Sequence, residues 1–151
     1  KKMFHLPQSL QTLRKRLLLI IALILASPAW AQEVDPPAFA YLLHCSGCHL
    51  EDGSGDPPTI PDLRYDLGKL LDSPEGRSYT IRVPGVTDAL VPAEEMAALM
   101  NWMVGFLYPE RTEFQPFTTE EIVAGRENPL YDPLRFRQQL IATQAASEAL
   151  K

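Results

Sequence analysis

The stretch Cys45-Ser46-Gly47-Cys48-His49 contains both cysteines of the 151-residue sequence. Two thiols three positions apart lie on the same side of a turn or helix. The histidine directly after the second thiol adds an imidazole beside them. Two cysteines are too few for a disulfide scaffold, so this pentapeptide is the most informative part of the chain.

The spacing C-x-x-C-H is the attachment signature of c-type haem. Each thiol can bond one vinyl group of the same porphyrin, and the histidine is then placed beneath the ring as the proximal iron ligand. We therefore predict one haem c, bound covalently through Cys45 and Cys48 and ligated by His49. The sequence contains no second C-x-x-C-H motif, which indicates a single-haem protein.

Three other uses of paired cysteines fit the sequence less well. A thioredoxin-like pair follows a strand and opens a long helix, whereas residues 37–44 before this pair are typical of a short helix. A structural zinc site needs more ligands, and His44 is the only further histidine or cysteine after the leader described next. A disulfide between cysteines three positions apart would be strained and would leave the histidine unexplained.

The first part of the sequence has the pattern of an export signal. Residues 1–31 contain five basic residues and no acidic one, and an apolar run of ten residues, 17–26, is followed by Ala29-Trp30-Ala31. A membrane-spanning helix needs about 20 apolar residues, so the run is too short to span. We predict a signal peptide cleaved after Ala31, hence a periplasmic or otherwise exported protein without a membrane span. An uncleaved N-terminal anchor is the alternative.

Removal of this leader changes the charge. The whole sequence has a formal net charge of −5, and the part after Ala31 keeps 9 basic and all 19 acidic residues, a net charge of about −10. Nucleic-acid binding needs the opposite sign. We expect instead a redox protein partner with a basic docking face.

The remaining pattern predicts helices separated by irregular segments. A helix over 38–44 places Phe39, Leu42 and Leu43 at helical spacing. A loop is expected over 50–61, a short helix over 63–71, a turn over 73–76, an extended segment over 79–83 and a turn at Pro84-Gly85. Pro92 suits the first position of a helix running to about Tyr108.

This order resembles the class I cytochrome c fold: a short helix, C-x-x-C-H, an irregular middle, and a last helix carrying Trp102. The resemblance covers about residues 39–108. It implies an all-α haem domain over 32–110, and a small periplasmic cytochrome that accepts electrons from a dehydrogenase. The segments Glu75-Gly76-Arg77-Ser78-Tyr79, Arg82-Val83-Pro84-Gly85 and Asn101-Trp102 look like a subgroup of such single-haem proteins.

The sequence departs from this family at the sixth iron ligand. Class I cytochromes take it from a methionine, commonly near a proline ahead of the last helix, and here Val83-Pro84 occupies that place. The methionines after the leader are Met96, Met100 and Met103, which form one helical stripe suited to core packing. Met96 is the candidate sixth ligand, being nearest the start of the helix.

Residues 111–151 extend beyond the haem domain as a C-terminal helical extension. Thr118-Thr119-Glu120-Glu121 indicates a capped short helix. Asp132-Pro133 can start another, with Leu134, Leu140 and Ile141 on one face. Packing against the haem domain is the favoured role, and a docking arm for a partner protein, carrying Arg135 and Arg137, is the alternative.

Two functions follow from these patterns. The first is a periplasmic single-haem electron carrier for a dehydrogenase or respiratory partner, free or as a subunit of a complex, with no catalytic residues of its own. The second is a haem protein with an open sixth position, acting as a small-molecule binder or peroxidase-like enzyme. Arg82 and Tyr79 would then be polar groups beside the iron. Their favoured roles are a haem-propionate partner and a packed aromatic, and that of His44 is a surface or propionate contact.

Overall fold

The computed structural model describes residues 8–25 and 35–149. Its contacts divide the chain into two compact units, Lys1–Glu33 and Val34–Lys151. In the first, α1 (Gln8–Leu25) contains the basic cluster and most of the apolar run. Across the described ranges, no helix is both long and apolar enough to cross a membrane. The predicted cleavage site after Ala31 lies outside the described residues.

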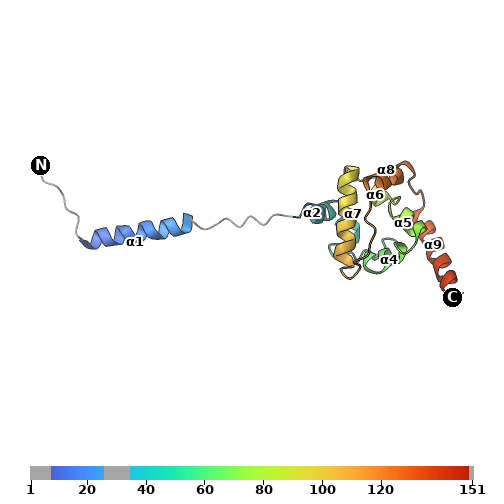
Figure 1. The fold of residues 1–151 in the computed structure, drawn as a ribbon, viewed down its shortest axis with the longest axis horizontal. Helices are drawn as coiled ribbons and strands as arrows, with labels where there is room; N and C mark the ends of the chain where they lie inside the picture. The colour runs from blue at the N-terminus through green and yellow to red at the C-terminus, as the bar shows by residue number, and fades with distance from the viewer. Residues whose placement is uncertain (1–7, 26–34, 150–151) are drawn as a thin grey trace. The chain divides into compact units, whose positions relative to one another are not determined.

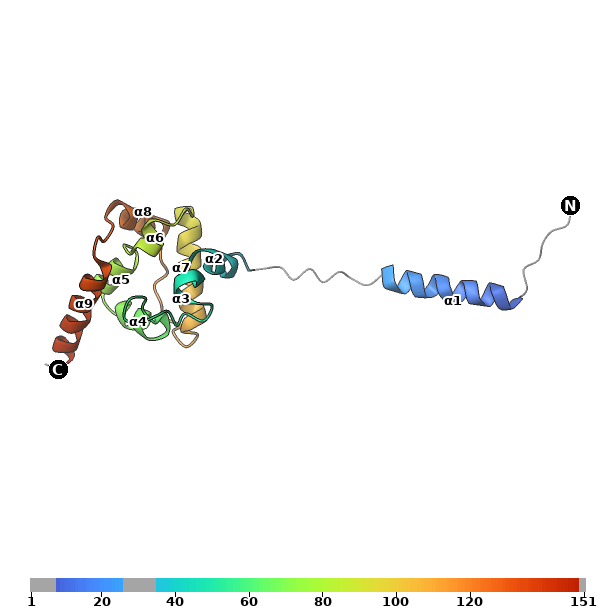
Figure 2. The same cartoon turned by 180° about the vertical axis from the view of Figure 1, so that it is seen from behind.

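The second unit is built from helices around α7, and Figures 1 and 2 show its two sides. The described residues contain no strand, and one isolated bridge joins Asp56 and Ile60. This confirms the predicted all-α class. The helices of this unit are α2 (Pro36–His44), α3 (Ser46–His49), α4 (Leu63–Leu70), α5 (Pro74–Thr80), α6 (Pro84–Thr87), α7 (Ala93–Leu107), α8 (Thr119–Glu127) and α9 (Pro133–Glu148).

Helix α7 is the centre of the core. It starts after Pro92, carries two acidic residues in its first turn, and buries Met96, Leu99 and Met100 to 1% exposure. Acidic side chains stabilise the positive end of a helix, and the apolar stripe at helical spacing drives its burial. The start, the end and the apolar stripe of this helix are as the sequence predicts.

Helix α2 packs across α7 through aromatic rings. Tyr41 is 1% exposed and its ring lies 5.7 Å from that of Trp102. The buried face of α2 is not the one that the sequence predicts: Phe39, Leu42 and Leu43 are each about half exposed or more. Tyr41 takes the buried place because its ring packs on α7 while its hydroxyl reaches a carbonyl, that of Leu50, at 2.8 Å.

The predictions for residues 73–83 are wrong. The expected turn and extended segment are instead α5 and the turn that leads into α6. Ser73 caps α5 by accepting a hydrogen bond from the Gly76 amide at 3.1 Å, and Pro74 occupies the first turn. These are helix-start signals. The β-branched residues after Tyr79 favour a strand locally. In the structure α5 instead packs against α4 and α9, and α6 packs against α8.

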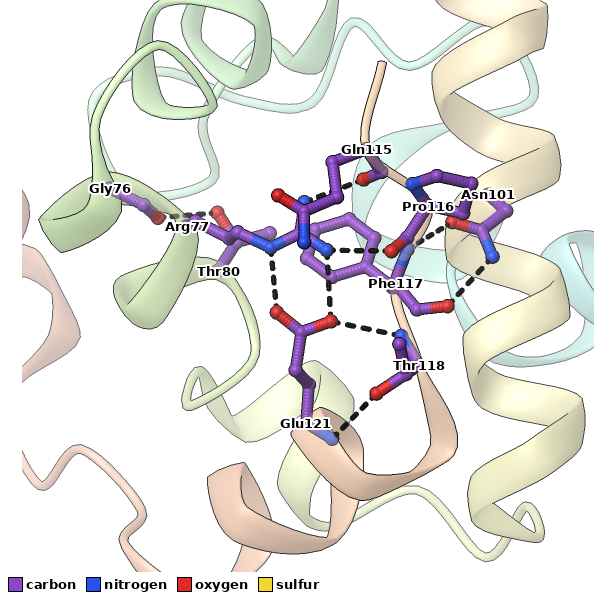
Figure 3. Close-up of polar contacts among 9 residues, drawn as sticks. All are labelled: Gly76, Arg77, Thr80, Asn101, Gln115, Pro116, Phe117, Thr118 and Glu121. Atoms are coloured by element: carbon purple, nitrogen blue, oxygen red, sulfur yellow. Dashed lines mark hydrogen bonds and ion pairs between the residues drawn. The ribbon is translucent and has the colours of Figure 1, made fainter.

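The C-terminal residues 111–149 belong to the same compact unit as the residues before them. Helix α8 begins with the predicted cap: the Thr118 hydroxyl and the Glu121 carboxylate each accept a hydrogen bond from the other residue's amide. Glu121 also binds Arg77 of α5 at 2.7 Å. Figure 3 shows the guanidinium facing that carboxylate and the carbonyls of Gln115 and Pro116.

Two further contacts attach this segment. The Asn101 side chain of α7 exchanges hydrogen bonds with the backbone of Phe117, at 2.7 and 3.0 Å. Gly125 of α8 lies so close to the approach to α6 that an added Cβ would be 2.3 Å from the Ile81 carbonyl oxygen. Glycine therefore permits the close packing of α8.

We expect Gly125→Ala to lower the free energy of unfolding by about 2 kcal/mol, because the new methyl group overlaps backbone. Gly105→Ala is the matched control in α7, where an added Cβ meets nothing within 4 Å. It should raise the stability by about 0.5–1 kcal/mol, the helix propensity difference. Urea unfolding followed by circular dichroism measures both, and equal effects of the two changes would contradict the packing.

Arg77→Ala should lower the free energy of unfolding by about 2 kcal/mol, because it removes the ion pair with Glu121 and the hydrogen bonds to two carbonyls. Arg64→Gln is the control. Arg64 pairs with Asp52 and Asp62 at an exposed position, and its loss should leave stability close to that of the unaltered protein. Denaturant titrations at one salt concentration distinguish the two.

The same pair makes stability depend on pH. The Arg77 hydrogen bond lowers the pKa of Glu121 below its ordinary value of 4.5. A carboxylate with a depressed pKa stabilises the folded state above its unfolded pKa and loses that effect as pH falls through the folded pKa. The stability difference between the unaltered protein and Arg77→Ala should therefore shrink on acidification below about pH 4.5. A difference that stays constant from about pH 6 to about pH 3 would contradict the ion pair.

Candidate functional site

The motif residues lie on the wall of an apolar cavity of about 460 Å³ inside the second unit. This volume is within the range of cofactor and ligand sites. Every helix of the unit except α8 contributes to the wall. The lining residues are His44, Cys45, Cys48, His49, Thr59, Ile60, Pro61, Leu63, Asp66, Leu67, Leu70, Tyr79, Thr80, Val83, Pro84, Gly85, Val86, Met96, Leu99, Met100, Met103, Pro133, Leu134 and Arg137.

The end of α2 and the short α3 bring the two thiols and the imidazole together. The Cys45 carbonyl accepts the amides of Cys48 and His49 at 3.1 and 2.9 Å, which makes one tight helical turn. Cys45 is partly buried, and burial with the nearby Cys48 raises its pKa to about 11. Cys48 is exposed at the surface edge of the cavity. The two cysteines are therefore one inside and one at the rim.

His49 has a defined orientation. Its Nδ1 lies 3.2 Å from the Pro61 carbonyl oxygen, so Nδ1 carries the hydrogen and donates it. The lone pair of Nε2 is then free. Burial lowers the pKa of His49 below its ordinary value, which keeps the ring neutral at pH 7. A neutral imidazole with Nε2 free is the form that binds a metal ion.

The loop after the motif is folded back to hold Pro61 in place. Gly55 has a φ of +62°, and a Cβ there would lie 2.5 Å from the Pro61 carbonyl oxygen. Its amide binds the His49 carbonyl at 3.2 Å. Tyr41 donates to the Leu50 carbonyl, and its burial raises the pKa of its hydroxyl to about 12. The loop therefore positions the carbonyl that orients the histidine.

The three methionines of α7 all line the cavity and are nearly or fully buried. Val83 and Pro84 line it as well, ahead of α7. Among the described residues, no cluster of three or more histidine, cysteine or acidic side chains is placed to hold a separate metal ion. The structure thus brings Met96 to the same cavity as His49.

Two polar residues singled out from the sequence have different places. Tyr79 lines the cavity and stacks on Phe136 of α9, with ring centroids 5.9 Å apart. Arg82 does not line it. Its Nε donates to the Asn128 carbonyl at 2.6 Å, and its guanidinium lies over the Phe136 ring. The structure thus places Arg82 outside the cavity wall, because the C-terminal segment binds this side chain.

Sequence reasoning missed Arg137 as a site residue. It is 6% exposed and is in the cavity wall, where it hydrogen-bonds the Pro58 carbonyl. A signal was present, because position 137 is three residues after Leu134 and four before Ile141, on the face expected to be apolar. Sequence reasoning also missed Asp66, which is the acidic residue among the described residues that line the cavity.

The fold and the site define an all-α protein in which two thiols and one oriented imidazole face one apolar cavity. Two proteins from Thermus thermophilus, both named cytochrome c-552, are similar to it. One is 29% identical over 124 residues, covering 69% of this chain and 82% of that protein. The other is 30% identical over 98 residues, covering 52% of this chain and 75% of that protein.

The chain belongs to the c-type cytochromes. No protein-family model matches it, and no solved structure matches it significantly. The cofactor of this family is haem c. The residues present fit that group: the thiols are near the imidazole, the imidazole has the tautomer for iron, and the wall is mostly apolar.

Proposed function

We propose that this protein is an exported, single-haem c-type cytochrome of the class I kind that carries electrons for a dehydrogenase or respiratory partner, free or as a subunit of a complex. The observation that carries the proposal is the convergence of Cys45, Cys48 and His49 on one apolar cavity, with His49 oriented by the Pro61 carbonyl. The single C-x-x-C-H motif supports one haem.

Each residue of the motif has a separate role in this proposal. Cys45 and Cys48 bond the porphyrin edge, and His49 ligates the iron through Nε2. The haem supplies a one-electron couple between ferric and ferrous iron. The apolar wall excludes water from it. Because Cys48 is exposed, the edge bonded there is near the surface, where a partner can approach.

Charge and the leader support an exported carrier with a basic partner. The residues after Ala31 have a net charge of about −10, which speeds encounter with a positively charged surface at low ionic strength. The basic and then apolar leader, of which α1 is the described part, is typical of a signal peptide cleaved near Ala31.

His49→Ala should keep a covalently attached haem but lose the low-spin absorption spectrum, because the proximal ligand is removed. His44→Ala is the matched control: His44 is exposed beside the same cysteines and should leave the spectrum unchanged. Optical spectra of both purified proteins, with pyridine haemochrome to measure attached haem, make the comparison. An unaltered spectrum of His49→Ala would contradict the proximal assignment.

For the sixth ligand we propose Met96. It is 1% exposed, lies in the cavity wall, and is in the first turn of α7. A second function is favoured by one observation: Val83 and Pro84 line the cavity where the family commonly supplies a methionine. Valine cannot ligate iron, and an open sixth position would make the protein a small-molecule binder or a peroxidase-like enzyme.

Met96→Leu should remove the methionine–iron charge-transfer band of the oxidised protein and lower the reduction potential, because the thioether is lost. Met100→Leu, equally buried on the same helix, should retain both. Rapid carbon monoxide binding by the reduced, unaltered protein, with a high-spin spectrum, would instead support the open sixth position and contradict the ligation by Met96.

A further inference from the structure

Arg137 is a buried cation in the wall of the cavity. It is 6% exposed. Among the described residues that line the cavity, the other basic side chains are histidines. It comes from α9, far along the chain from the cysteines. Its Nη2 donates to the Pro58 carbonyl, and Pro58 is in the same loop as Pro61. The guanidinium therefore lies on the side of the cavity where that loop holds His49.

The guanidinium has no acidic partner among the described residues. The four ion pairs there involve Arg64, Arg77 and Arg111. Asp66 also lines the cavity, yet it forms none of these pairs. A buried charge is costly unless it is paired and hydrogen-bonded. The cavity thus presents a positive charge that an anion inside it would neutralise.

Arg126 of α8 is a useful comparison, because its hydrogen-bond donors are paired with backbone carbonyls. Arg126 also lacks an acidic partner among the described residues, but it donates to three carbonyl oxygens, those of Val86, Ala89 and Val91. It does not line the cavity. For Arg137 the polar neighbours are the Pro58 carbonyl and Tyr79; burial raises the pKa of Tyr79, and nearby Arg137 opposes part of that rise. Arg137 thus lines the cavity with fewer carbonyl acceptors than Arg126 has among the described residues.

We propose that Arg137 binds a carboxylate of the porphyrin, so that α9 closes the cavity over the cofactor and the cofactor in turn holds α9. This inference rests on the proposed haem function. The ionisable substituents of the porphyrin are its two propionates, and a planar guanidinium fork matches a carboxylate in two parallel hydrogen bonds. Arg137 is then a positioning residue supplied from outside the 39–108 region that resembles class I cytochromes.

The other contacts of α9 make this coupling effective. Phe136 stacks on Tyr79, and Gln144 donates to the Ser73 hydroxyl at 3.0 Å. Leu134 lines the cavity but is 36% exposed, and Ile141 is 41% exposed, so apolar burial holds this helix only partly. An Arg137–carboxylate pair adds an attachment that is present only when haem is bound.

The test uses the full haem-loaded protein and four variants. Arg137→Gln removes the charge at similar length, and Arg137→Lys keeps the charge without the fork. Arg135→Gln removes a charge from an exposed position on the same helix. Asp66→Asn tests the acidic residue of the same cavity wall as the alternative partner. Three readouts apply to each: the haem carboxylate bending band in resonance Raman, the reduction potential, and amide hydrogen exchange over 134–146.

We expect Arg137→Gln to shift the carboxylate band, lower the reduction potential by removing a positive charge near the iron, and speed exchange in α9. Arg137→Lys should restore part of each change. Arg135→Gln should leave the band and the exchange unaltered. If Arg137→Gln does not accumulate, an altered band in Arg137→Lys supports the pair and an unaltered one overturns it.

Two results separate this inference from the proposed function. With haem attached, Arg137→Gln that matches Arg135→Gln in all three readouts overturns the role of Arg137 and leaves the electron carrier intact. The same shifts in Asp66→Asn would overturn it by making Asp66 the partner of Arg137. A chain with no haem by pyridine haemochrome overturns both proposals together.

Discussion

The structure depends on a cavity of about 460 Å³ at the centre of the second unit. Protein interiors are close-packed, and a void of this size forfeits contacts of the side chains around it. The motif, the loop after it and α4 to α7 all contribute side chains to its wall. A rigid apolar group that fills the space therefore organises these segments. The c-type cytochromes meet this requirement with haem.

Arginines supply several of the polar contacts that tie the C-terminal segment to the rest of the unit. Arg77 of α5 reaches Glu121 and two carbonyls ahead of α8. Arg126 of α8 reaches back to one carbonyl of α6 and to two in the link between α6 and α7. Arg82 and Asn128 form a third connection. Guanidinium groups suit this because one side chain satisfies several backbone oxygens at once. The contacts of Arg82 and Arg126 hold the segment 81–91, part of which lines the cavity.

Local signals sufficed where one residue or one period determines the structure. The start of α7, the capping box of α8, the Asp132 cap of α9 and the helical class all follow from patterns within a few residues. They failed for α5, where β-branched residues near Tyr79 suggested an extended segment. There a short cap sequence, Ser73-Pro74, and packing against α4 outweighed strand propensity.

The candidate site also has a part that local sequence predicts and a part that it does not. The roles proposed for Cys45, Cys48 and His49 follow from the sequence, because that chemistry depends on spacing within one helical turn. The orientation of His49 was not, because it depends on a carbonyl from a loop that returns to the motif.

The sequence by itself therefore determined the C-x-x-C-H motif, the helical class and the acidic charge of the residues after Ala31. These depend on residue identity, short spacing and composition. Only the tertiary structure decided which face of α2 is covered, and that Arg137 rather than Arg82 is in the cavity wall. Those outcomes depend on how segments distant in the chain pack against one another. A side chain with polar atoms is buried where those atoms also find hydrogen-bond partners.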